Sequence, residues 1–173
     1  KKLYTRGDGN KGSDISRVFQ RGLGILNDSE RGQGPGEIVV KRSYFEDHLS
    51  NDFEYPRNFQ ASLIKEKELD KFARDAIDAK AALFVPFKQL PFWKGNIDEF
   101  KNQFLDIVIK LEGGVDFDID GVVFEIVNPE LKQFMGSNRK FHRWQIAYKE
   151  NKEKAQVKVI SVTAQVGRTG KIT

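Results

Sequence analysis

The residues of this sequence best suited to chemistry are charged groups beside turns and strand ends: Arg6, Glu37, Arg57, Asp120, Glu125 and Lys149. Arginine offers a planar fork of donors that suits phosphate oxygens, lysine is a compact cation, and a carboxylate accepts hydrogen bonds from hydroxyl or amine groups. Each residue taken alone also fits an ordinary turn or a solvated surface. Only their combination indicates a binding site.

Length and composition limit the elements that can position these groups. The 173 residues are enough for one domain with a sizeable core, or for one domain and the start of a second. A net charge of +4 suits a polyanionic partner without requiring one. The absence of cysteine excludes disulfides and thiolate nucleophiles, and is compatible with a reducing, cytoplasmic location.

Neither a membrane span nor a native start is expected in this sequence. No apolar run approaches the roughly 18 to 20 residues that cross a bilayer, so no membrane partner is expected. The chain begins at Lys1 and its one methionine is Met135, so we expect that Lys1 is not the native start.

Turn residues and hydrophobic periodicity predict an α+β fold with antiparallel sheets. Predicted strands cover residues 37–41, 82–86, 122–127, 144–149 and 157–163. Predicted helices cover residues 43–49, capped by Ser43, as well as 57–65, 96–110 with a capping box at Asn96 and Glu99, and 129–135. The charged connector Glu150–Lys154 predicts two units, residues 1–154 and a small β domain at 155–173.

Six segments carry a resemblance that no single one of them would establish. They are Thr5–Asp14 (TRGDGNKGSD), Gly36–Val40 (GEIVV), Tyr55–Leu63 (YPRNFQASL), Asp118–Asn128 (DIDGVVFEIVN), Arg143–Lys149 (RWQIAYK) and Gln165–Gly170 (QVGRTG). In this order and approximate spacing they resemble the motif series of NAD-dependent DNA ligases of the bacterial or phage type. The resemblance implies the nucleotidyltransferase (adenylation) fold of these ligases, which is ATP-grasp-like, followed by the first strand of an OB-fold.

The resemblance also implies an activity. Such ligases seal nicks in duplex DNA by three phosphoryl transfers, through lysyl-AMP and DNA-adenylate intermediates, with NAD and Mg²⁺. Their nucleophilic lysine lies in a Lys-x-Asp-Gly motif roughly twenty residues before TRGDG. We expect that motif outside this chain, on a missing N-terminal segment or on a second chain. The expected partner is nicked double-stranded DNA.

Residue roles follow from the resemblance by position. Lys149 and Asp120 match catalytic residues, with Lys149 touching the α-phosphate. Arg6, Glu37 and Arg57 match nucleotide-contacting residues, with Arg6 and Arg57 near the phosphate and Glu37 on ribose or adenine. No residue is assigned to a metal. Trp144 and Tyr148 are expected in the core or the wall of the site.

Other positions are predicted to contact the nucleic acid or depart from the family pattern. Lys65, Arg143 and Arg168 are the predicted nucleic-acid contacts, although Lys65 stands where the family usually has arginine. Glu125 lies in the nucleotide pocket where the family has lysine, so an anion replaces a cation there. Lys110 and Lys132 are the lysines that can compensate for this change.

Two alternatives stay open. The first is a non-catalytic ligase-fold relative that binds nucleic acid or protein, a reading favoured by the absent nucleophile and by Glu125. The retained charged residues of the pocket oppose it. The second is an ATP-dependent ligase or an mRNA-capping relative, which shares the fold but matches PRNFQASL and QVGRTG less closely.

Overall fold

The computed structural model describes residues 1–8, 11–27, 34–138, 141–150 and 158–166. The helices are α1 (Arg17–Gln20), α2 (Arg42–His48), α3 (Pro56–Leu63), α4 (Lys71–Asp78), the 3₁₀ helix η1 (Phe87–Gln89), α5 (Ile97–Gly113) and α6 (Pro129–Met135). The strands are β1 (Gly24–Ile25), β2 (Gly36–Val40), β3 (Ala82–Pro86), β4 (Val122–Glu125) and β5 (Gln145–Tyr148).

The first sheet has the strand order β1-β3-β2. Strand β2 is antiparallel to β3, with Glu37 opposite Val85. The predicted antiparallel pairing is confirmed for β2 with β3, whereas strand β1 is parallel to β3. The physical reason is the connection: a parallel pair needs a long crossover, and the chain between β1 and β3 is long enough to contain β2 and three helices.

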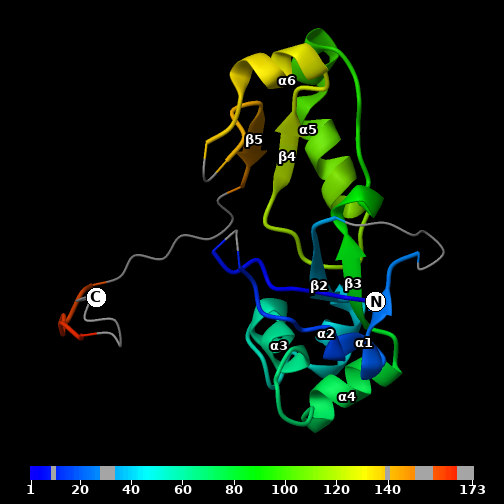
Figure 1. Cartoon of the computed structure of the whole chain (residues 1–173), viewed down its shortest axis with the longest axis vertical. Helices are drawn as coiled ribbons and strands as arrows, with labels where there is room; N and C mark the ends of the chain where they lie inside the picture. The colour runs from blue at the N-terminus through cyan, green and yellow to red at the C-terminus, as the bar shows by residue number, and fades with distance from the viewer. Residues whose placement is uncertain (9–10, 28–33, 139–140, 151–157, 167–173) are drawn as a thin grey trace.

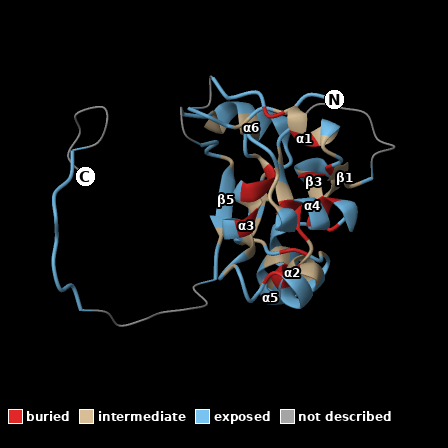
Figure 2. Ribbon diagram, turned by 90° about the horizontal axis from the view of Figure 1, so that it is seen from below, coloured by how far each residue is buried: buried red, intermediate tan, exposed pale blue. Residues whose placement is uncertain are grey.

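The core lies on both faces of this first sheet. Val40 belongs to a cluster with Phe59 and Leu63 of α3, which are fully buried. Val39, the preceding residue, packs on the opposite face with Phe117. Successive strand residues point to opposite faces, so a sheet covered on both sides needs apolar residues at consecutive positions. Figure 2 shows buried segments gathered around β3 and α4, whereas β5 is exposed.

The second sheet is the antiparallel pair β4 and β5. Phe124 and Tyr148 pack against Phe104 of α5, with ring centroids 5.6 and 4.9 Å away. Figure 1 shows α5 beside this hairpin and α6 across its far end. Since side chains alternate along a strand, Glu125 and its cross-strand partner Gln145 lie on the face turned away from α5.

Several predicted elements are confirmed with small shifts at their ends. Strands β2, β3, β4 and β5 and helices α3, α5 and α6 fall where the sequence placed them. The predicted capping box also forms, since Asn96 Oδ1 accepts from the amides of Asp98 and Glu99, and Glu99 Oε2 accepts from the amide of Asn96.

Two local predictions were wrong. Lys41, not Ser43, is the N-cap of α2, because the Ser43 hydroxyl donates instead to Asp116 Oδ2 at 2.8 Å. Residues 158–165 carry no strand, and their apolar side chains, such as Ile160, are exposed. Figure 1 and Figure 2 place residues 158–166 apart from both sheets. Among the described residues, no helix has the length and apolar character needed to cross a membrane.

Candidate functional site

A cluster of opposite charges joins α3 to the start of β4 and the end of β5. Arg57 is the second residue of α3, Asp120 directly precedes the turn into β4, and Lys149 follows β5. Arg57 Nη2 donates to Asp120 Oδ2 at 2.5 Å, across 63 residues of sequence. Lys149 Nζ lies 3.8 Å from the same oxygen. One carboxylate therefore holds two cations close enough for a single phosphate to contact both.

Gly121 makes the approach of Asp120 to Lys149 possible. Its φ of +146° lies in a region that favours glycine. A Cβ at this position would collide with the carbonyl oxygen of Tyr148. The glycine therefore lets the start of β4 lie directly against the end of β5, where Lys149 follows.

The charges of this cluster are stabilised and accessible. The hydrogen bond from Arg57 is the main reason that the pKa of Asp120 lies below its usual range, and the bond to Asp120 raises the pKa of Arg57. The side chains of Arg57, Asp120 and Lys149 are 69%, 60% and 64% exposed. Asp120 and Arg57 therefore stay ionised near neutral pH, and a ligand can reach all three side chains from solvent.

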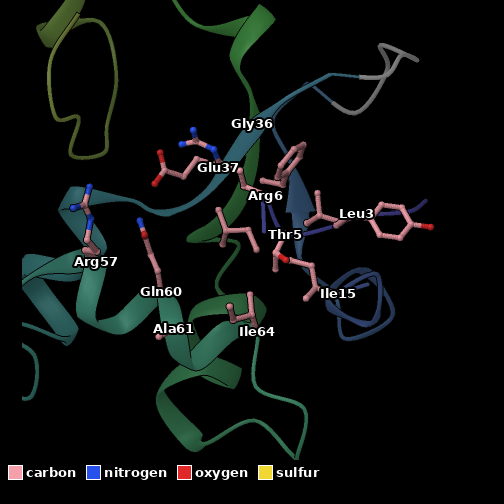
Figure 3. Close-up of a pocket in the computed structure, with 13 residues that line it drawn as sticks. Leu3, Thr5, Arg6, Ile15, Gly36, Glu37, Arg57, Gln60, Ala61 and Ile64 are labelled. Carbon is pink, nitrogen blue, oxygen red and sulfur yellow. The ribbon is translucent and has the colours of Figure 1, made fainter. Parts of the chain in front are cut away.

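A cavity of about 320 Å³ lies beside this cluster. Figure 3 shows Arg6, Glu37, Arg57 and Gln60 around it, from the TRGDG turn, β2 and α3. Apolar side chains complete its wall: Leu3, Ile15, Ile38, Ala61, Ile64 and Phe84. Two arginines, a carboxylate and an amide at the edge of an apolar pocket suit a ligand with a phosphate, hydroxyl groups and an apolar part.

The turn that carries Arg6 is fixed by its own hydrogen bonds. The amide of Thr5 donates to the carbonyl of Ser13 at 2.9 Å, and Asp8 Oδ1 accepts from the amide of Lys11 at 2.8 Å. Gly7 has a φ of +55°, and a Cβ there would collide with the carbonyl of Lys11. Glycine at this position thus permits the tight turn that the sequence predicted.

A larger cavity of about 1810 Å³ lies between the two sheets. Glu37 and Arg57 line it as well as the smaller cavity, so the two spaces adjoin. Asp120, Glu125 and Arg143 also belong to its lining. Five of the predicted site residues therefore face one continuous space, although they come from β2, α3 and the second sheet.

Glu125 is engaged on both of its oxygens. Lys132 Nζ lies 3.1 Å from Oε1, and Gln145 Nε2 donates to Oε2 at 3.0 Å. The hydrogen bond from Gln145 and then that from Lys132 lower the pKa of Glu125, so the group is a carboxylate at neutral pH. Of the two compensating lysines predicted from the sequence, Lys132 is the one bonded to Glu125 in the described part of the chain.

Two of the three predicted nucleic-acid contacts, Lys65 and Arg143, lie within the described residues. Lys65 Nζ lies 3.0 Å from Asp70 Oδ2. The backbone carbonyl of Lys65 accepts hydrogen bonds from the side chains of Arg17 and Arg21. Arg143 lines the larger cavity. Arg168 lies outside the described residues.

Gln60 and Gln145 are polar residues of the site that sequence reasoning missed. Gln60 follows Arg57 by three positions, and the i to i+3 spacing of a helix could have revealed it. Gln145 could not be found in this way, because only the register of β4 with β5 places it opposite Glu125.

The described ranges contain no group of three or more histidine, cysteine, aspartate or glutamate side chains placed to share a metal ion.

Over its whole length, the chain is similar to proteins named DNA ligase. It is 65% identical over 172 residues to the DNA ligase of Ruthia magnifica subsp. Calyptogena magnifica. The aligned region covers 99% of this chain and 28% of that relative. The DNA ligase of Psychromonas ingrahamii is 52% identical, covering 99% of this chain and 26% of the relative.

A more distant relative aligns over the same extent. The DNA ligase of Mycoplasma capricolum subsp. capricolum is 30% identical over 200 residues, covering 98% of this chain and 30% of the relative. The chain therefore spans between a quarter and a third of the length of these curated relatives. No protein-family model matches it.

Proposed function

We propose that this chain is part of an NAD-dependent DNA ligase that seals nicks in duplex DNA through lysyl-AMP and DNA-adenylate intermediates. The observation that carries the proposal is the convergence of Arg57, Asp120 and Lys149 beside a cavity lined by Arg6 and Glu37. The relatives named DNA ligase support it, since they align with the whole chain. NAD and nicked DNA are then the substrates, and residues 1–154 the nucleotidyltransferase part.

The chain's own residues would act on phosphate charge. Lys149 contacts the α-phosphate of the AMP group in transfer, and Arg57 supplies a planar fork of donors to neighbouring oxygens. Asp120 holds these two cations in register before the substrate arrives. Catalysis of phosphoryl transfer depends mainly on such positioned charges, so a preorganised pair is what the reaction requires.

The remaining pocket residues would fix the nucleotide's orientation. Glu37 accepts hydrogen bonds from ribose hydroxyls or the adenine amine, and Arg6 contacts phosphate or ribose. The printed sequence contains no Lys-x-Asp-Gly tetrapeptide. The nucleophilic lysine of the proposed reaction therefore lies outside these 173 residues, and residues 155–173 begin the OB-fold.

AMP transfer from NAD tests the proposal directly. The isolated chain, incubated with NAD and Mg²⁺, is expected to gain no AMP adduct by mass spectrometry. The complete ligase that contains this chain is expected to gain one adduct with NAD, none with ATP, and to seal a nicked duplex. An AMP adduct on the isolated chain, or adenylation by ATP in place of NAD, would contradict the proposal.

A non-catalytic nucleic-acid or protein binding module is the second candidate. One observation favours it, namely the carboxylate of Glu125 in a cavity that is meant for an anionic ligand. Binding of a nicked duplex by the complete protein without any adenylation would establish that alternative.

A further inference from the structure

Lys132 connects α6 to the β4–β5 hairpin. Its Nζ lies 3.1 Å from Glu125 Oε1 and 4.2 Å from the centroid of the Trp144 ring. The Lys132 side chain is 27% exposed, whereas that of Glu125 is 45% exposed. Within the described residues, the lining of the larger cavity includes Glu125 but not Lys132. The carboxylate thus faces the cavity, and the lysine stands behind it.

The lysine is itself held in place. The Trp144 ring beneath Lys132 stacks on the His142 ring, with ring centroids 4.5 Å apart and an interplanar angle of 17°. His142 Nδ1 lies 2.6 Å from Ser137 Oγ, just beyond the end of α6. A cation over an indole ring gains from the ring's electron-rich face. The ion pair is therefore supported from both the helix and the hairpin.

Glu125 shares a hairpin face with the phosphate-binding end of the site. Glu125 lies four positions beyond Gly121, a distance of about 13 Å along a strand. A carboxylate at about that distance repels an anionic ligand bound at Arg57, which lines the same cavity as Glu125. Protonation does not remove this charge, since the pKa of Glu125 is lowered. The charge is offset by Lys132 instead.

We propose that Lys132 is a positioning residue for the nucleotide: by neutralising and orienting Glu125, it lets that carboxylate face the cavity without repelling an anionic ligand. This inference rests on the proposed function, since it takes the anionic ligand to be NAD and the AMP group derived from it. The fixed carboxylate remains able to accept a hydrogen bond from a ligand hydroxyl, because each of its oxygens has a second lone pair.

A double-substitution cycle in the complete ligase tests this role. The variants are Lys132→Met, Glu125→Gln and the combination of both, with Lys101→Met on the exposed face of α5 as the matched control. Methionine keeps an unbranched stem over the Trp144 ring and removes the charge together with the hydrogen bond to Glu125. The readouts are KM for NAD and kcat of lysyl-AMP formation, at low and high salt.

The expected result is a rescue. Lys132→Met alone is expected to raise KM by about threefold to tenfold, as one uncompensated charge at roughly 13 Å in a solvated cavity implies. Its kcat should change by less than about twofold, because Lys132 does not touch the reacting atoms. Adding Glu125→Gln should return KM to within about twofold of the Glu125→Gln variant, and high salt should shrink the effect. The Lys101→Met control should match the unsubstituted enzyme.

Each other outcome is informative. If the combined variant keeps the raised KM of Lys132→Met, the lysine acts through packing on Trp144, and the proposal is overturned. If Lys132→Met leaves KM unchanged, Glu125 does not act on the ligand, and the proposal is likewise overturned. An unsubstituted complete protein that forms no lysyl-AMP from NAD would instead overturn the proposed function, and this inference with it.

Discussion

Replacement of Lys149 by alanine separates the role of this residue in the reaction from its role in the fold. Lys149 Nζ lies 3.8 Å from Asp120 Oδ2, and both side chains are more than half exposed. Exposed ion pairs contribute roughly 0.2 to 1 kcal/mol. The Arg57–Asp120 hydrogen bond remains in the variant, so the free energy of unfolding should fall by less than about 1 kcal/mol.

The expected effect on the reaction is much larger. A preorganised group that stabilises developing charge typically accounts for about 10² to 10³ in rate. Because Asp120 already holds Lys149 next to Arg57, little reorganisation is needed when the phosphate arrives. We therefore expect Lys149→Ala to slow AMP transfer by about 10² to 10³. An effect on stability of less than about 1 kcal/mol could not produce that loss by unfolding.

The assay is single-turnover sealing of a nicked duplex by the complete ligase, with thermal unfolding measured on the same preparations. Lys71→Ala is the matched control, because Lys71 is an exposed lysine at the start of α4. Figure 1 shows α4 at the end of the molecule away from β4 and β5. A sealing rate for Lys149→Ala within about threefold of the control would refute the reasoning and make Lys149 a solvated strand-end residue.

Three further predictions follow from contacts in the structure. Arg57→Gln should raise the pKa of Asp120, seen by carboxyl NMR, because the Arg57 hydrogen bond is the largest cause of its lowering. An unchanged pKa of Asp120 in Arg57→Gln would contradict this prediction. In the unsubstituted protein, the contribution of Asp120 to stability is complete above the ordinary aspartate pKa of about 3.9, and it is lost as the pH falls from there through the lowered pKa of the folded state. Gly121→Ala should lower the free energy of unfolding, measured in urea, by about 1 to 3 kcal/mol, because alanine disfavours the positive φ and its Cβ would collide with the Tyr148 carbonyl. An unchanged free energy of unfolding would contradict the need for glycine in this turn. Asn96→Ala should lower the free energy of unfolding by about 1 kcal/mol in the same measurement, since it removes the cap of α5. An unchanged free energy of unfolding would mean that water replaces the cap.

Elements with strong local signals could be predicted from the sequence. The capping box at Asn96 and Glu99 is a contact between neighbours in the chain, so its residues alone indicate where α5 begins. Strands β2 and β3 have consecutive apolar residues bounded by glycine or proline. By contrast, the parallel pairing of β1 depends on a partner some sixty positions away, Leu83 opposite Gly24, and no local pattern specifies it.

The site divides in the same way. The residue types near turns and strand ends, with the family resemblance, predict which charges belong to it. Their pairing could not be predicted, because the Arg57–Asp120 contact spans 63 residues and requires α3 to meet the turn before β4. For Lys65 the nucleic-acid contact stays a prediction from its position in the sequence. No local pattern specifies its pairing with Asp70 or the hydrogen bonds that its backbone carbonyl accepts from Arg17 and Arg21.

Glu125 illustrates why a change of charge has to be interpreted with its neighbours. The sequence left Lys110 and Lys132 as equal candidates for the missing cation. Lys110 lies in the last turn of α5, and α5 packs on the hairpin face that carries Phe124 and Tyr148. Glu125 points to the other face, because side chains alternate along β4. Lys132 reaches it from α6, which crosses the end of the hairpin. The local electrostatics are therefore set by strand alternation and by one helix position, and the carboxylate and its cation form a neutral pair at this end of the cavity.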